Sequence, residues 1–333
     1  MRPLLLTMGD PTGVGPELII KALLAGIGDR LDHPLEVVGD SGCLLRAARI
    51  FTDDTRLETA EGGHQHLVIG ERRLQIAQRS ALDVTRLNYG SPDATCGRAM
   101  AEYVEYAIER CLTGTAAGIV TCPINKAAIN ASGYHFPGHT ELLAERCGVD
   151  KVVMMLAGET LKVCLVTTHL AHRDIASRLT SAEIYRTIKI SATTLQQQFG
   201  LKKPRLAVLA LNPHAGENRL FGDEEERLIL PAIRRAQEEG IAADGPHSAD
   251  TLFHFAVRGA YDAVVCMYHD QGLIPLKLLH FDDAVNVTLG LPIVRTSVDH
   301  GTAYDLAGTG KANIASLAAA LTMADRMAGN VDA

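Results

Sequence analysis

Three histidines each come just after a strand-like run of the sequence, and imidazole is a common ligand of divalent metal ions. His169, His214 and His269 each follow a strand-like run, namely 161–168, 206–213 and 263–267. Open α/β sheets bind ligands beyond the carboxyl ends of their strands. Three imidazoles brought together there could hold one divalent ion and leave positions open for a substrate.

This metal-site prediction depends on strand topology. The intervals of 45 and 55 residues between the three histidines fit no compact zinc motif. The chain has thirteen histidines, so a surface or structural role is the alternative for any one of the three.

A second group of residues could bind an anion. Lys277, Asn286 and Arg295 occur in a segment otherwise rich in Leu, Val and Pro. Arg295 follows an apolar run, and a partly buried guanidinium favours a carboxylate or phosphate partner, with an internal salt bridge as the alternative. Upstream, Thr140 is expected as the N-cap of a helix whose main-chain donors could receive an anion, although the segment 138–141 is also typical of a plain helix start.

The segment 299–313 predicts a nucleotide-binding loop. Gly301, Gly308 and Gly310 would let a ligand approach the backbone closely, and Asp305 could accept a hydrogen bond from a ribose hydroxyl. A carboxylate there favours NAD over NADP, because it would repel a 2′-phosphate. No strand is followed by a GxGxxG fingerprint, so a standard Rossmann site is not expected.

These residues need a framework, and strand-like and helical patterns alternate along the chain with short connections. The alternation predicts an α/β fold with a mostly parallel sheet covered on both faces. Residues 52–92 are polar and irregular, with short strand candidates. Strands are expected at 4–8, 35–40, 117–121, 152–156, 162–167, 205–211, 262–267 and 284–288, and helices near 16–24, 41–50, 95–112, 141–147, 181–199, 224–239, 249–258 and 313–328.

Composition excludes several classes of partner. A net charge of −7, a pI near 6 and the lack of Trp argue against nucleic-acid binding. No run of about 18 apolar residues occurs, so we expect a soluble protein without a membrane partner. The seven cysteines form no CxxC pair, which favours reduced thiols and a cytoplasmic location.

Several motifs resemble those of one enzyme family. The segment 300–313 resembles the NAD loop of the isopropylmalate and isocitrate dehydrogenases, and the opening 9–17 is also similar to theirs. Over nearly all 333 residues the chain more closely resembles the 4-hydroxythreonine-4-phosphate dehydrogenase family of pyridoxal 5′-phosphate synthesis. The motifs, in the family's order and spacing, are Pro137-Gly138-His139-Thr140-Glu141, Thr168-His169, Leu211-Asn212-Pro213-His214-Ala215-Gly216-Glu217 and Tyr268-His269-Asp270-Gln271-Gly272.

The resemblance implies a fold, an assembly and a set of functional residues. The fold implied is isopropylmalate-dehydrogenase-like, with two α/β/α domains around a central cleft. Residues 1–130 and 292–333 would form the first domain and 131–291 the second. The implied assembly is a homodimer with its sites at the subunit interface, so that one metal ligand could come from the partner. The implied ligands are His169, His214 and His269 for the metal, His139, Thr140, Lys277, Asn286 and Arg295 for the substrate, and Gly301, Thr302, Asp305 and Asn313 for NAD.

The implied reaction is oxidation of 4-(phosphooxy)-L-threonine by NAD with one divalent ion (Zn, Co, Mg, Mn or Ni). The product, 2-amino-3-oxo-4-(phosphooxy)butanoate, would lose CO₂ to give 3-amino-2-oxopropyl phosphate. His139 and Asp250 are the candidate general bases. The family usually has Pro where this chain has Ser248, so the loop before Asp250 could differ in shape.

Other activities remain open at this point. The same motifs suit a paralogous dehydrogenase of 4-phospho-D-threonate, of 4-phospho-D-erythronate or of a dihydrodiol dicarboxylate. From other classes, three strand-end histidines also suit a metal-dependent hydrolase, and a non-catalytic binding protein is the remaining alternative.

Overall fold

The computed structural model of the chain describes residues 1–60, 64–134 and 138–332. Pro137, the first residue of one family motif, lies outside the described residues. The chain forms two compact units: unit 1 comprises Met1–Asp150 and Leu291–Gly329, and unit 2 comprises Lys151–Gly290 with the residues from Asn330 onward. Residues 131–150, which the sequence interpretation assigned to the second domain, are thus part of unit 1.

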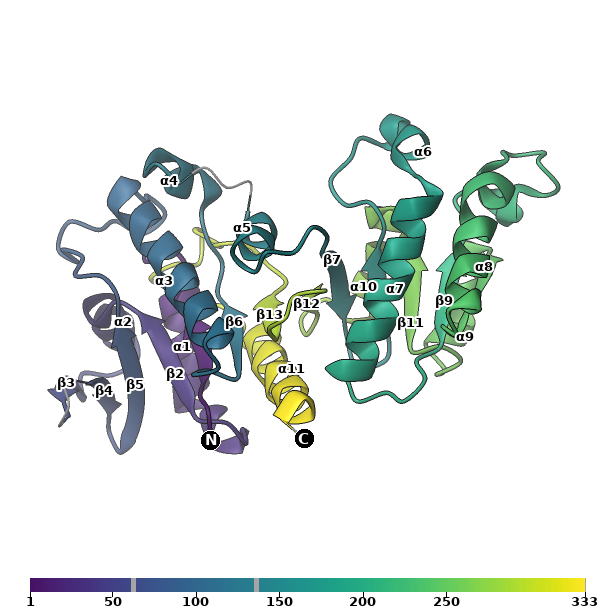
Figure 1. Cartoon of the computed structure of the whole chain (residues 1–333). Coiled ribbons are helices and arrows are strands. Elements are labelled where there is room, and N and C mark those ends of the chain that lie inside the picture. Colours follow the sequence, from purple (N-terminus) through teal and green to yellow (C-terminus); the bar gives the residue numbers. More distant parts are fainter. Residues whose placement is uncertain (61–63, 135–137, 333) are drawn as a thin grey trace. The chain divides into compact units, whose positions relative to one another are not determined.

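Unit 1 contains a mainly parallel sheet (Figure 1). Its strand order is β13-β6-β1-β2-β5-β4-β3, and β3 and β4 extend one edge by antiparallel pairing. All four residues of the central β1 are buried, so both faces of that strand are covered. The strands are β1 (Leu4–Thr7), β2 (Leu35–Gly39), β3 (Thr55–Thr59), β4 (Gln65–Ile69), β5 (Arg72–Gln78), β6 (Gly118–Thr121) and β13 (Arg295–Val298).

The helices of unit 1 begin at polar caps or close turns. Asp40, Asp93 and Asn125 each accept a hydrogen bond from the main chain three residues later, which satisfies a donor at the start of α2, α3 and α4. Of these, α3 packs over β1, β2 and β6. The helices are α1 (Gly15–Leu24), α2 (Ser41–Ala48), α3 (Ala94–Leu112), α4 (Lys126–Ala131), α5 (His139–Arg146) and α11 (Ala315–Asp332), with a 3₁₀ turn at Gly28–Arg30.

The strands of unit 2 follow the order β10-β9-β11-β8-β7-β12. The first four strands are parallel, and β7 runs antiparallel to both β8 and β12. The strands are β7 (Val153–Ala157), β8 (Lys162–Leu165), β9 (Leu206–Leu209), β10 (Ala243–His247), β11 (Ala263–Cys266) and β12 (Val285–Leu289). The helices are α6 (Ile175–Arg178), α7 (Ser181–Gln197), α8 (Leu230–Glu238), α9 (Ala249–Ala256) and α10 (His269–Leu279), with 3₁₀ turns at His172–Asp174 and Pro213–Gly216 and a π-helical segment at Glu225–Ile229 that runs into α8.

The predicted α/β class with mostly parallel strands is confirmed, but the sequence did not predict α10. That helix contains Gly272 and Pro275, two residues with poor helix propensity, which explains the omission. A Cβ on Gly272 would lie 2.9 Å from Cys266 Sγ, so glycine is what lets α10 approach β11 closely. Packing on β8 and β11 therefore stabilises a helix that the local sequence does not favour.

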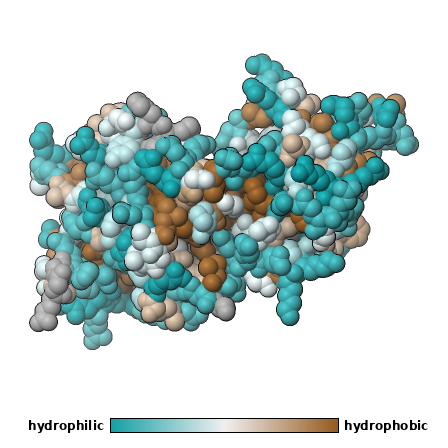
Figure 2. All heavy atoms as spheres, in the orientation of Figure 1, coloured by the Kyte–Doolittle hydropathy of each residue, from teal (hydrophilic) through white to brown (hydrophobic). Residues whose placement is uncertain are grey.

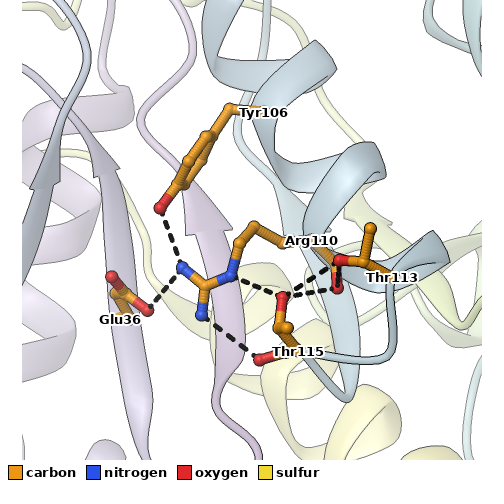
Figure 3. Close-up of polar contacts among 5 residues, drawn as sticks. All are labelled: Glu36, Tyr106, Arg110, Thr113 and Thr115. Atoms are coloured by element: carbon orange, nitrogen blue, oxygen red, sulfur yellow. Dashed lines mark hydrogen bonds and ion pairs between the residues drawn. The ribbon is translucent and has the colours of Figure 1, made fainter.

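Polar contacts also fasten helices to the sheet away from the candidate site. In unit 1, Arg110 of α3 extends towards Glu36 of β2 and donates to Tyr106 and Thr115 (Figure 3). The face shown in Figure 2 is largely hydrophilic, with apolar side chains gathered in patches. No helix in the described part of the chain is both long enough and apolar enough to cross a bilayer.

Candidate active site

The three histidines predicted at strand ends follow three neighbouring parallel strands of unit 2. Because β9, β11 and β8 are consecutive and parallel, their carboxyl ends lie at one edge of the sheet. Thr167 Oγ1 donates to the Met267 carbonyl at 2.7 Å. Gln271 accepts from the Met267 N–H and donates to the Ala210 carbonyl, both at 2.7 Å. Side chains thus join the three strand ends to one another.

His169 and His269 lie side by side at this edge, with ring centroids 5.7 Å apart. Together with Tyr268 and Asp270 they line a hollow of about 210 Å³. Asp270 Oδ1 lies 2.7 Å from His269 Nδ1, so Nδ1 carries the proton and Nε2 keeps its lone pair for a ligand. A carboxylate behind a histidine is the usual support of a metal-binding imidazole. The pair therefore has the chemistry of part of a metal site.

His214 stands apart from this pair. Its ring packs beside Phe221, with centroids 6.2 Å apart, and it does not line the hollow of His169 and His269. Among the described residues of a single chain, no three His, Cys, Asp or Glu side chains are grouped so that they could hold a metal ion. The donor types suit a divalent ion, and His169 and His269 would be two of the three protein ligands that a catalytic site usually has.

A cationic group lies in unit 1. Arg295, only 3% exposed, begins β13, and its Nη2 donates to Thr121 Oγ1 at 2.8 Å. Burial lowers the pKa of Arg295 to about 10, so the guanidinium is still charged at neutral pH. His139 is partly exposed, but its Nε2 is buried, and burial, followed by the charges of Arg295 and Lys126, holds its pKa well below 6.5. Two cations beside a neutral imidazole offer several hydrogen-bond donors to an anion.

Thr140 does not have the position that the sequence predicted. α5 begins at His139, and Gly138 is its N-cap, so the expectation that Thr140 is the N-cap was wrong. The backbone of Gly138 is extended, as an N-cap requires, and the helix starts earlier than the side-chain pattern indicated. Thr140 therefore lies within the first turn of α5, next to His139.

The other predicted substrate and catalytic residues belong to unit 2 and lie on separate elements. Lys277 is on α10, with its Nζ 5.5 Å from the ring centroid of Phe281. Asn286 is on β12, paired with Leu156 of β7. Asp250 is exposed in the first turn of α9, just after Ser248. Lys277, Asn286 and Asp250 thus lie on three different elements of unit 2, and their functional roles stay predictions.

The segment 299–313 is held against α1 in unit 1. The Glu17 carboxylate is buried and accepts from the N–H groups of Gly308 and, at 2.7 Å, Gly310. Lys21, one turn further along α1, donates to the carbonyls of Gly310 at 3.2 Å and Ala312 at 2.5 Å. One helix thus supplies an acceptor and a donor that set the path of the glycine-rich backbone.

Tyr304 makes a second connection to this loop. Its hydroxyl donates to Asp10 Oδ2 at 2.6 Å and accepts from Asn125 Nδ2 at 2.7 Å. Burial, and then the bond to Asp10, raise the pKa of Tyr304 to about 12, so the hydroxyl stays protonated and keeps donating. The opening turn of the chain and the loop near its end are therefore linked through Tyr304.

The predicted NAD residues lie along this loop. Gly301 has open space where a side chain would be, and Asp305 is exposed. The Thr302 carbonyl accepts from the Val14 N–H at 3.1 Å, and the Asn313 side chain accepts from Ala315 N–H at 2.9 Å at the start of α11. Open space at Gly301 and the exposed acid Asp305 are compatible with a nucleotide, and the NAD contacts stay a prediction.

Sequence analysis did not identify the residues that hold the candidate ligands in place. Asp270 could have been recognised, because it directly follows His269 in a motif that the analysis quoted. Glu17 lies in the first turn of α1, where an acid stabilises a helix start, and its contact with a loop 291 residues away has no local signal. Lys126 carries no local signal, because its place near His139 depends on the fold.

Comparison with known proteins identifies the family. The profile of the family described as "Pyridoxal phosphate biosynthetic protein PdxA" matches residues 31–324. The chain belongs to this family. A 4-hydroxythreonine-4-phosphate dehydrogenase from Geobacter metallireducens is 54% identical over 325 residues, which cover 98% of this chain and 95% of that protein.

Two further relatives of the PdxA-family chain bear on fold and substrate. The crystal structure of 4-hydroxythreonine-4-phosphate dehydrogenase from Klebsiella pneumoniae is 39% identical, has a TM-score of 0.87 and covers 98% of each chain. A protein from Oceanobacillus iheyensis, provisionally named D-threonate 4-phosphate dehydrogenase, is 42% identical over 97% of each chain. The predicted family and α/β fold are confirmed, as is the oxidoreductase class that the family names carry.

Proposed function

We propose that the chain oxidises 4-(phosphooxy)-L-threonine to 2-amino-3-oxo-4-(phosphooxy)butanoate, with NAD as the oxidant and one divalent ion. Loss of CO₂ from this β-keto acid then gives 3-amino-2-oxopropyl phosphate. The observation that carries the proposal is the pair of imidazoles, His169 and His269, at the edge where neighbouring parallel strands end. Family membership supports the same substrate, because the relative at 54% identity is named for it.

His169 and His269 would hold the ion, and His214 would complete the set. Bound there, a divalent ion lowers the pKa of a substrate hydroxyl and polarises a carbonyl, which serves both oxidation and decarboxylation. Asp270 keeps His269 in the tautomer whose Nε2 can act as a ligand. Imidazole ligands suit Zn, Co, Mn or Ni, and suit Mg least, since Mg prefers oxygen.

The cationic group of unit 1 is suited to the phosphate of the substrate. Arg295 and Lys126 supply positive charge, and His139 remains neutral because its pKa is held down. The charges of Arg295 and Lys126 disfavour a protonated His139. A bound phosphate would offset these charges and raise the pKa of His139, so the imidazole would be a better proton acceptor once substrate is present. Asp250 is the other candidate base. Thr140, Lys277 and Asn286 stay predicted substrate ligands on the family resemblance.

The loop 299–313 would bind NAD, with Gly301, Thr302, Asp305 and Asn313 as its predicted contacts. Bound NAD would supply the hydride acceptor for the carbon that carries the hydroxyl, and the hydroxyl proton would pass to the general base, His139 or Asp250. The exposed Asp305 can accept from a ribose hydroxyl and disfavours the 2′-phosphate of NADP. Glu17 and Lys21 keep the loop backbone in position for this contact.

We further propose that the chain acts as a homodimer with its sites at the subunit interface. Apolar side chains of α10 and the turn after it are exposed, and Leu278 is 84% exposed. Several large apolar side chains exposed on one helix and the turn after it are typical of a protein interface. A second copy would also supply the metal ligand that the described residues of one chain leave missing. The exposed residues are Ile274, Leu278, Leu279 and Phe281.

Substrate turnover tests the proposal. Full-length protein is treated with a chelator, and NADH formation is measured with and without added Zn, Co, Mg, Mn or Ni. We expect NADH from 4-(phosphooxy)-L-threonine only when an ion is present. His169→Ala and His269→Ala should abolish turnover, whereas His64→Ala, at an exposed histidine of unit 1, should not. Full turnover by metal-free enzyme would contradict the metal assignment.

The 42% identical D-threonate relative makes 4-phospho-D-threonate the second candidate substrate, and 4-phospho-D-erythronate and a dihydrodiol dicarboxylate are tested beside it. Faster NADH formation from one of these would transfer the assignment to a paralogous dehydrogenase. Release of inorganic phosphate without NADH, together with absence of NAD binding, would instead favour a metal-dependent hydrolase.

A further inference from the structure

The loop that carries His214 has an unusual backbone. Five of the six described non-glycine residues with positive φ lie within 214–219, and Gly216, in the same stretch, has φ 81°. His214 itself has φ 52° and ψ 31°. The left-handed region is strained for a residue with a side chain. Contacts from outside the turn must therefore hold it in place. The five residues are His214, Ala215, Glu217, Asn218 and Arg219.

A carboxylate, that of Glu225, occupies the inside of this loop and is only 4% exposed. Its Oε1 accepts from the N–H groups of Leu211 at 2.9 Å and Asn212 at 2.8 Å, and its Oε2 accepts from Asn212 Nδ2 at 3.1 Å. A Cβ on Gly216 would lie 2.7 Å from Oε2, so the turn closes tightly over the carboxylate. Glu225 thus binds the start of the loop directly, and its carboxylate lies close to Gly216 in the middle of the loop.

Polar contacts hold the start of this turn, and the His214 ring packs beside Phe221 further along. Leu220 and Phe221, the large apolar residues of the turn, are both exposed. A buried carboxylate is costly, and it persists where its hydrogen bonds are needed. Glu225 also begins the π-helical segment Glu225–Ile229, and π turns are rare and concentrate at functional sites. Strain, buried charge and a π turn coincide around one candidate ligand.

We propose that Glu225 is a positioning residue for His214: its buried carboxylate holds the left-handed turn that directs the imidazole towards a divalent ion. This inference rests on the proposed function, which assigns His214 to the metal. It holds whether His214 serves its own chain or a partner, because both residues belong to one loop. Replacing the residues that support metal ligands commonly weakens metal affinity by about 10- to 100-fold.

Cobalt binding by the full-length protein tests this role. Chelator-treated wild type, Glu225→Gln and His214→Ala are titrated with Co²⁺ by calorimetry, and the absorption spectrum of the bound ion is recorded. Glu224→Gln is the matched control, because this neighbouring acid accepts from the Asn212 side chain at 2.7 Å, and no bond from it to the loop main chain occurs in the described residues. We expect Glu225→Gln to bind Co²⁺ about 10- to 100-fold more weakly, with an altered spectrum, and Glu224→Gln to match wild type.

The outcomes separate this inference from the proposed function. If His214→Ala loses affinity while Glu225→Gln binds Co²⁺ as wild type does, Glu225 has no positioning role and the metal assignment stands. If wild type binds no Co²⁺, or His214→Ala binds as tightly as wild type, the metal role of His214 fails. Thermal unfolding checks that each variant is folded. Should Glu225→Gln not fold, Glu225→Asp replaces it, because the shorter carboxylate keeps its charge but cannot reach both N–H groups; unchanged Co²⁺ affinity in that variant overturns the inference.

Discussion

Replacing Glu17 by Gln tests how the nucleotide loop is held. The buried carboxylate accepts from the N–H groups of Gly308 and Gly310. Glutamine keeps one acceptor oxygen, so one N–H would face an amide NH₂ in place of a carboxylate. Hydrogen bonds to a charged group contribute about 1.5–3 kcal/mol, and we expect a loss of about 2 kcal/mol.

If the lost hydrogen bond destabilises the ordered conformation of the loop, fewer chains have the conformation that binds NAD, and the affinity for NAD falls in proportion. About 2 kcal/mol corresponds to roughly 30-fold in the dissociation constant, which is the upper limit. Because Lys21 still binds Gly310 and Ala312, we expect an increase of roughly 10-fold. Calorimetric titration with NAD measures this, and urea unfolding measures the change in stability.

Glu36→Gln is the matched control, since Glu36 is also a buried carboxylate of unit 1, 5% exposed, and lies in the Arg110 network of Figure 3. It should lower the free energy of unfolding and leave the affinity for NAD unchanged. The reasoning about the loop is refuted if Glu17→Gln loses stability but binds NAD as tightly as wild type. In that case Glu17 would stabilise the fold alone.

Three further predictions concern pH, backbone and assembly. The pKa of His139 is held well below 6.5 in the folded chain, so just below that pH only the unfolded chain takes up the proton, and wild type should lose up to about 1.4 kcal/mol of stability per pH unit. Urea unfolding at about pH 5.5 and 7.5 measures this loss, and the loss between the two pH values should be smaller in His139→Gln. An equal loss in wild type and variant would contradict the prediction. Gly308→Ala should lower stability by about 1–3 kcal/mol and weaken NAD binding, because Gly308 has φ 82° and a Cβ would lie 2.5 Å from the Tyr89 ring. Urea unfolding and calorimetric titration with NAD measure the two effects. Unchanged stability and NAD affinity would mean that the loop can adopt another backbone path. Leu278→Asp should convert a dimer into monomers in size-exclusion chromatography with light scattering, and a persisting dimer would exclude the α10 face as the interface.

Local patterns alone determined much of the framework. Apolar runs before His169, His214 and His269 predicted strands that the structure contains as β8, β9 and β11. Alternation with helices predicted parallel pairing, and parallel pairing places the three strand ends at one edge of the sheet. These inferences succeeded because side-chain periodicity and short connections are properties of neighbouring residues.

Only the tertiary structure decided which residues meet. Contacts between segments distant in the chain make β9, β11 and β8 neighbours and bring Glu17 to the loop at 308–310. Such contacts also decide that His269 lies beside His169 while His214 lies apart. The helix α10 likewise forms because Gly272 allows close packing on β11. Such contacts cannot be predicted from local sequence, because their free energy comes from burial and hydrogen bonds that exist only once distant segments have come together.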